Sequence, residues 1–184
     1  MKPNKKLYQL GVFSFIFIML LVQVCFYKNV FFCLVNDLKE KLHEQCMLKV
    51  KERMSSLRAE LDSLKESAAS DTKSSMGDKY ETSREMINLE KGKLTGQLSE
   101  AMEMHTILNS FDLSNPAQRI GLGTLVYTNI AKYYIAVALG PLQVGEEQVF
   151  VISPGSPLGR QLLNKQLRDQ VTVGSSLQEI LEAH

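Results

Sequence analysis

A long, uninterrupted amphipathic pattern constrains the fold of this chain more than any other feature. From Leu38 to Ala68 apolar residues recur at steps of three and four positions, and no Pro or Gly interrupts the run. This heptad-like spacing is typical of a helix that packs one face against another helix. The pattern predicts a helix of about 32 residues, about 48 Å long at about 1.5 Å per residue. The stripe consists of Leu38, Leu42, Cys46, Val50, Met54, Leu57, Leu61, Leu64 and Ala68.

A polar segment then interrupts the pattern before it resumes. Residues 68–78 (AASDTKSSMGD) contain no large apolar side chain except Met76, and Ser, Asp and Gly accumulate there. A second stripe follows and runs to about Phe111. A short polar link between two equal amphipathic helices predicts an antiparallel hairpin over residues 37–113, with its tip near residues 70–81. The second stripe consists of Ile87, Leu94, Leu98, Ala101, His105 and Leu108.

Two acids, Asp78 and Glu81, stand at the predicted start of the second helix. Their spacing approximates a capping box with Asp78 at the cap position, and acids are favoured near a helix N-terminus in any case. On spacing alone, capping is the simpler interpretation. His43 and His105 lie singly on helices and have no partner in the sequence pattern, so a packed or edge-exposed position is expected for both.

Strand-like runs replace the helical period after residues 114–116. Segments rich in Val, Ile, Tyr and Thr predict strands at 123–129, 132–139, 145–153 and 168–173, with Gly140-Pro141 ending the second. Residues 156–165 predict a short helix, with Ser156 as its cap and Pro157 at its first position. The residues after 173 form either a short strand or a frayed end. The chain is therefore expected to be α+β, with a small antiparallel sheet covered by one helix in residues 114–184.

The first 36 residues form a separate apolar leader. Residues 7–27 are almost wholly apolar, follow three lysines and are long enough for one membrane-spanning helix. Three interpretations stay open: a signal anchor, a cleaved signal peptide, or a start codon assigned too early, with the natural chain beginning near Val35. The chain is expected to associate with a membrane only if residues 7–27 are retained.

Composition argues against several classes of function. There are 21 basic and 20 acidic residues, so the net charge of +1 gives no electrostatic basis for binding nucleic acid directly. The three cysteines, Cys25, Cys33 and Cys46, form no CxxC pair, which argues against structural zinc. Nucleotide-loop and nucleophile motifs are missing from the sequence, so an independent enzyme is not expected.

Two stretches resemble the GreA/GreB family of bacterial transcription factors. The segment Gly77-Asp78-Lys79-Tyr80-Glu81 is similar to the family's hairpin-tip pattern of Gly-Asp, two residues and Glu. The segment VISPGSPLGRQLLNKQLRDQVTV (151–173) is similar to the family's series of strand, Ser-Pro, small helix and strand. Asn164 stands where the family has a second Gly, and Asn can also adopt a left-handed turn. The resemblance implies a coiled-coil hairpin followed by an FKBP-like C-terminal domain.

The resemblance also implies a partner and a role for the acids. RNA polymerase is the implied partner: the C-terminal domain docks on it, and the hairpin enters its secondary channel. Asp78 and Glu81 are the implied catalytic and metal-binding residues, because they would share a Mg²⁺ ion with the polymerase and promote cleavage of backtracked RNA. Mg²⁺ takes oxygen ligands and needs only one or two carboxylates besides phosphate and water. No stably bound cofactor and a cytoplasmic location are expected.

Two alternatives stay open. Tyr80 stands between the acids, and Thr82 replaces the Asn that usually follows the Glu in the family. These departures favour a polymerase binder that occupies the channel without cleaving RNA. The apolar leader favours a membrane-anchored coiled-coil interaction protein whose β domain works outside the cytoplasm.

Overall fold

A computed structural model describes residues 37–68, 77–113 and 119–184. The chain divides into two compact units, Met1–Lys39 and Glu40–His184. The predicted apolar N-terminal helix and residues 69–76 of the predicted tip lie outside the described residues. No helix within the described ranges is long and apolar enough to cross a bilayer. The larger unit holds two long helices, a six-stranded sheet and a short helix, which confirms the α+β fold class.

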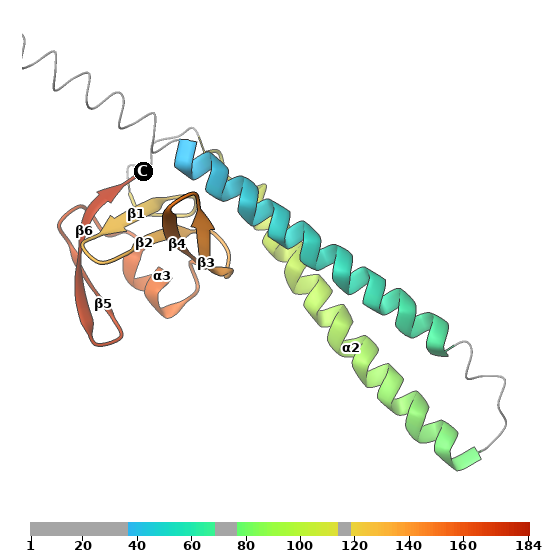
Figure 1. The fold of residues 1–184 in the computed structure, drawn as a ribbon. Helices are drawn as coiled ribbons and strands as arrows, with labels where there is room; N and C mark the ends of the chain where they lie inside the picture. Colours follow the sequence, from blue (N-terminus) through green and yellow to red (C-terminus); the bar gives the residue numbers. More distant parts are fainter. Residues whose placement is uncertain (1–36, 69–76, 114–118) are drawn as a thin grey trace, which may run out of the picture. The chain divides into compact units, whose positions relative to one another are not determined.

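Two long helices form the predicted hairpin (Figure 1). The first covers residues 37–68, and α2 covers Gly77–Leu108. Along the seam, Leu57 and Leu61 of the first helix pack with Leu94 and Ala101 of α2. These are positions of the two apolar stripes, so the predicted pairing of the helices along the stripes is confirmed. The stripe residues of the first helix that are buried are Leu42, Cys46, Val50, Leu57 and Leu61.

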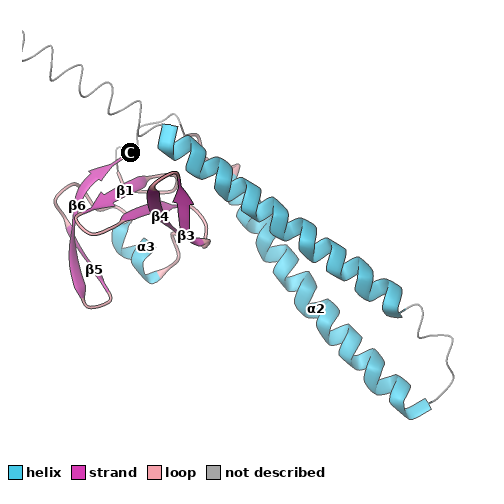
Figure 2. Cartoon of the chain, viewed as in Figure 1, coloured by secondary structure: helices cyan, strands magenta, loops and turns pink. Residues whose placement is uncertain are grey.

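The β domain is built around one six-stranded sheet with the strand order β3-β4-β2-β1-β6-β5 (Figure 2). All neighbouring strands pair antiparallel except β2 and β4, which are parallel, with Tyr134 opposite Val151. The expected antiparallel sheet therefore includes one parallel pair. The strands are β1 Leu125–Thr128, β2 Lys132–Ile135, β3 Gly140–Val144, β4 Glu147–Ile152, β5 Gln170–Val173 and β6 Ser176–Ala183.

Two strands differ from the sequence prediction. Gly140 and Pro141 do not end a strand but begin β3, because β3 is an edge strand and Pro needs no ladder hydrogen bond on an open edge. The expected second strand stops at Ile135, and residues 136–138 form a bend instead. The C-terminal residues form β6, an eight-residue strand that lies between β1 and β5.

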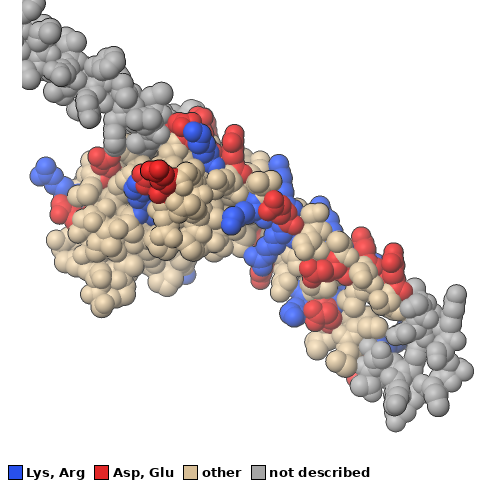
Figure 3. Space-filling model, in the orientation of Figure 1, with Lys and Arg blue, Asp and Glu red and all other residues tan. Residues whose placement is uncertain are grey.

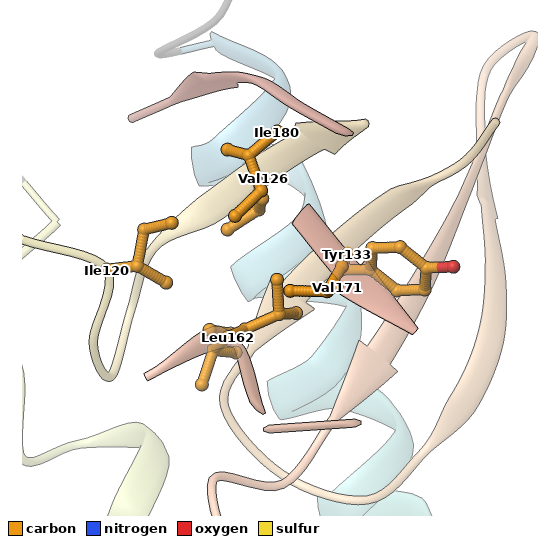
Figure 4. Close-up of a cluster of buried hydrophobic side chains, with 7 residues drawn as sticks. Ile120, Val126, Tyr133, Leu162, Val171 and Ile180 are labelled. Atoms are coloured by element: carbon orange, nitrogen blue, oxygen red, sulfur yellow. The ribbon is translucent and has the colours of Figure 1, made fainter. Parts of the chain in front are cut away.

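The core of the β domain lies between the sheet and helix α3, Pro157–Leu162. Leu162 of α3 packs with Val126, Tyr133 and Ile180 from the central strands (Figure 4). Ser156 caps α3 as predicted: its Oγ accepts a hydrogen bond from the Gly159 backbone N–H at 3.0 Å. The remaining buried members of this cluster are Ile120, Ile135 and Val171.

Candidate functional site

The predicted tip acids lie at the start of α2. Because α2 begins at Gly77, Asp78 lies inside the first helical turn, whereas the sequence placed it at the capping position ahead of the helix. Glu81 follows three residues later, and residues at this spacing are neighbours on a helix surface. The side chains of both acids lie outside the described part of the molecule. Their role as metal ligands therefore stays a prediction.

A buried junction joins the base of the hairpin to the sheet. The Tyr134 hydroxyl of β2 lies 3.2 Å from His43 Nδ1 on the first helix. Phe111, just after α2, packs edge-on against the His43 ring at 5.3 Å. A Cβ on Gly123 would lie only 2.6 Å from the Phe111 ring, so the glycine lets this ring approach the chain. Segments far apart in the sequence thus meet around one aromatic cluster.

This junction was missed in the sequence because its members are distant. His43 is packed, as expected, but its hydrogen-bond partner lies 91 residues away in the sequence, where the helical pattern gave no sign of it. The only local signal is Gly123, which adopts a positive φ of 80° where a side chain would be strained. Burial, and next the neighbouring Cys46, raise the pKa of the Tyr134 hydroxyl above its usual range. The phenol therefore stays protonated near neutral pH, and it donates to or accepts from His43 Nδ1 according to the tautomer of the imidazole.

The Cys46 thiol is part of the same buried region. Its side chain is fully buried, and burial raises its pKa to about 12 even though Lys49 acts in the opposite direction. A thiol in this state is a poor nucleophile, because the thiolate is the reactive form. Cys46 is thus a packing residue of the hairpin base, as its place in the apolar stripe suggests.

Residues 151–173, the stretch that carries the family resemblance, run from the end of β4 through a Ser-Pro loop and α3 to β5. After β4, Ser156 Oγ donates to the Ser153 carbonyl at 2.7 Å, and Ser153 Oγ accepts from the Gly155 N–H at 3.1 Å. Asn164 follows α3 with a φ of 64°, which confirms the left-handed turn expected for it. Its backbone N–H donates to the Ile120 carbonyl at 3.1 Å. The Ser-Pro loop is therefore fixed by local hydrogen bonds, and the end of α3 is held by a bond to a distant segment of the chain.

A small pocket lies where α2 meets the bend after β2. Its volume is about 210 Å³. One wall is a single face of α2, and the opposite wall is the bend with Ser153 at the end of β4. The floor is apolar, and the α2 wall adds two exposed carboxylates. The lining residues are Glu100, Glu103, Met104, Ile107, Ala136, Val137, Ala138 and Ser153.

Charged side chains of both signs gather along the hairpin in Figure 3, and much of the visible face of the β domain carries few of them. Lys and Arg side chains alternate with Asp and Glu along the hairpin, and no large patch of one sign stands out on that face. Within the described ranges, no group of three or more His, Cys, Asp or Glu side chains is arranged to hold a metal ion.

Comparisons with known proteins give one weak likeness. No protein-family model matches the chain, and no curated protein matches it. A solved structure described as "Structure of the transcription factor Gfh1" aligns at 16% identity, over 75% of this chain and 92% of that one. Its TM-score is 0.30. A likeness at this level carries no argument about function.

Proposed function

We propose that this chain is a Gre-like transcription elongation factor of the cytoplasm. It binds RNA polymerase through its β domain and inserts the helical hairpin into the secondary channel. It promotes cleavage of backtracked RNA by the polymerase and is not an enzyme by itself. The observation that carries the proposal is the order of parts: a paired-helix hairpin whose second helix begins with Asp78 and Glu81, followed by a β domain with a Ser-Pro loop and a short helix.

The dimensions and anchoring of the hairpin support this proposal. α2 has 32 residues and is about 48 Å long at about 1.5 Å per residue. Its seam with the first helix is closed by leucines, and a paired helix bends less than a single one. At the base, Tyr134 and His43 join the hairpin to the sheet. A rod held at its base can deliver side chains from its far end into a narrow channel.

The chemistry of the tip also fits the proposal. Asp78 and Glu81 supply carboxylate oxygens one helical turn apart, and these would hold Mg²⁺ together with ligands of the polymerase. Two carboxylates are too few for a complete Mg²⁺ site, so a shared ion is expected. When bound, that ion would stabilise charge on the oxygens that exchange at phosphorus during phosphodiester cleavage. The contribution of this chain is to place both carboxylates there.

A transcript-cleavage assay on stalled, backtracked complexes tests the proposal. The wild-type protein is expected to shorten the RNA, and the D78N/E81Q variant is expected to bind polymerase equally well without shortening it. The matched control is E85Q/E90Q, which removes the same charge from exposed positions further along α2. Unchanged shortening by D78N/E81Q would remove the tip acids from the mechanism, and failure of the wild type to co-purify with polymerase would sink the whole proposal.

A polymerase binder that does not cleave RNA is the second candidate. It is favoured by Tyr80 between the acids and by Thr82 after them, where the family pattern has Asn. The same assay separates the two candidates, because this one predicts tight binding with no shortening by the wild type. The membrane-anchored alternative depends on residues 7–27 alone. Mass spectrometry of the native N-terminus decides it, since a mature chain that begins near Val35 excludes an anchor.

A further inference from the structure

The pocket beside α2 is a second feature of the same helix that the proposed function does not use. Glu100 is 22 residues after Asp78, about 33 Å further along the helix at about 1.5 Å per residue. We infer that this pocket receives an arginine side chain of a partner protein, with Glu100 and Glu103 binding the guanidinium and the apolar floor packing on its stem. We take this partner protein to be RNA polymerase, and in that respect the inference rests on the proposed function.

The size of the pocket favours a single side chain as its occupant. Its volume of about 210 Å³ lies below the range of about 300–1,000 Å³ that is typical of pockets for small molecules and cofactors. Met104 and Ile107 are half-buried, and Val137 is buried opposite them. Such walls suit an aliphatic stem, and they give a nucleotide or a sugar few polar partners.

The charge of the pocket selects a cation. Glu100 and Glu103 both line the pocket and lie three residues apart on α2, a spacing at which residues are neighbours on a helix surface. Neither forms an ion pair with another residue in the described part of the chain. Two like charges this close repel each other, and a cation placed between them relieves the repulsion. The pocket therefore has an unmet preference for positive charge above an apolar floor.

Arginine meets both conditions better than lysine. Long basic side chains bury their methylene stems on apolar surface and keep the charged end in contact with water. The planar guanidinium presents several N–H donors in a fixed arrangement and can bind two carboxylates at once, whereas an ammonium group is a compact and strongly hydrated charge. The carboxylates of Glu100 and Glu103 would accept these hydrogen bonds at the mouth.

A titration of the isolated full-length protein tests the pocket without any polymerase. The probe is N-acetyl-arginine methylamide, followed through the NMR methyl signals of Met104 and Ile107. We expect saturable shifts of both signals that weaken with salt, and an affinity roughly tenfold lower in E100Q/E103Q, the loss expected at the upper end of the range for two exposed ion pairs. The norleucine analogue of the probe, which keeps an aliphatic stem without the charge, is expected to shift them little. E85Q/E90Q is the control with the same change in charge.

A second measurement places the pocket in the complex. Affinity for RNA polymerase is expected to fall roughly tenfold in E100Q/E103Q and also in A138F, whose ring would occupy the pocket while leaving both carboxylates in place. All the substituted residues are exposed, so folded variants are expected.

The outcomes separate the two ideas. If Met104 and Ile107 do not respond to the arginine probe, or respond equally in E100Q/E103Q, the pocket is not an arginine site, whatever the protein does with polymerase. If the probe binds as expected but the wild type does not bind polymerase, the proposed function fails and the pocket stands. If the probe binds and polymerase affinity is the same in all variants, the assignment of polymerase as the source of the arginine is overturned.

Discussion

Glycine-to-alanine substitutions test whether helix propensity or close backbone packing decides stability in this fold. Gly92 and Gly96 lie inside α2, and apart from the adjoining residues and backbone of the helix itself no atom lies within 4 Å of the place where a Cβ would stand on either. Alanine is favoured over glycine in a helix interior by about 1 kcal/mol, chiefly through backbone entropy. Gly92→Ala and Gly96→Ala are each expected to raise the free energy of unfolding by about 1 kcal/mol.

The same substitution at Gly159 is expected to lower the free energy of unfolding instead of raising it. A Cβ there would lie well inside van der Waals distance of the Ser153 carbonyl oxygen and 3.0 Å from Ser156 Oγ, the atom that caps α3. Overpacking at the upper end of its usual range costs about 3 kcal/mol and a lost cap about 1 kcal/mol, against a propensity gain of about 1 kcal/mol. The free energy of unfolding is thus expected to fall by about 3 kcal/mol.

Urea denaturation measures all three variants. Helical circular dichroism at 222 nm follows the hairpin, and the near-ultraviolet signal of Tyr127, Tyr133 and Tyr134 follows the sheet, since the chain has no Trp. With an m-value of about 2 kcal/mol/M, a loss of about 3 kcal/mol moves the midpoint by about 1.5 M. If Gly159→Ala unfolds at the wild-type midpoint or above it, the loop before α3 rearranges at little cost in free energy, and the argument from close packing is refuted.

Three further predictions concern the buried junction and the sheet. Tyr134→Phe removes the hydrogen bond with His43 and is expected to lower the free energy of unfolding by about 1 kcal/mol in the same denaturation experiment; an unchanged midpoint would show that this bond contributes nothing. In a variant whose two other cysteines are serine, Cys46 is expected to resist a thiol reagent at pH 8 until urea unfolds the chain, because its pKa is raised to about 12; rapid labelling of the native protein would contradict its burial. Burial first, and then two neighbouring glutamates, raise the pKa of Tyr127 to about 12. The folded state therefore holds this proton more tightly than the unfolded state, so the contribution to stability is complete below about pH 10 and is lost as pH rises toward 12. Ultraviolet titration of the native protein near 295 nm checks this, and ionisation of Tyr127 near pH 10 would argue against it.

The helical half of the fold could be predicted from sequence because its signal is local. Positions such as Leu42, Leu57 and Leu94 are fixed by a period of three to four residues, and all three are buried as expected. The cap at Ser156 and the left-handed turn at Asn164 were also local: each depends on one side chain and the next few backbone groups. Signals of this kind need no knowledge of the tertiary structure.

The sheet was harder to predict because its order depends on distant pairings. The parallel pairing of β2 with β4 cannot be recognised from the sequence of either strand, because both are short apolar runs. β6 was ambiguous because Leu177 and Leu181 are exposed while Gln178 is buried, which inverts the usual alternation. Gln178 tolerates burial because Thr128 and Tyr133 both donate hydrogen bonds to its side-chain oxygen. That network joins residues about 50 positions apart.

The candidate sites divide in the same way. The two tip acids were found from a short motif and a helix start, and α2 does begin beside them. The pocket had no signal in the sequence, and the aromatic junction had only Gly123, because each brings together residues from segments that are distant in the chain. From the sequence, Glu100 and Glu103 look like ordinary solvated charges. Only the tertiary structure shows that they line a pocket with the bend at residues 136–138.

The position of β6 in the sheet has a consequence for synthesis of the chain. β1 lies between β2 and β6, and Val126 pairs with Ala183, 57 residues later. During translation the hairpin and the first four strands leave the ribosome before β6 does. Until β6 arrives, β1 is an open edge that carries the apolar residues Leu125 and Val126, and such edges attract strands of other chains. A nascent chain that stalls at this stage is the form in which chaperone capture or aggregation is expected.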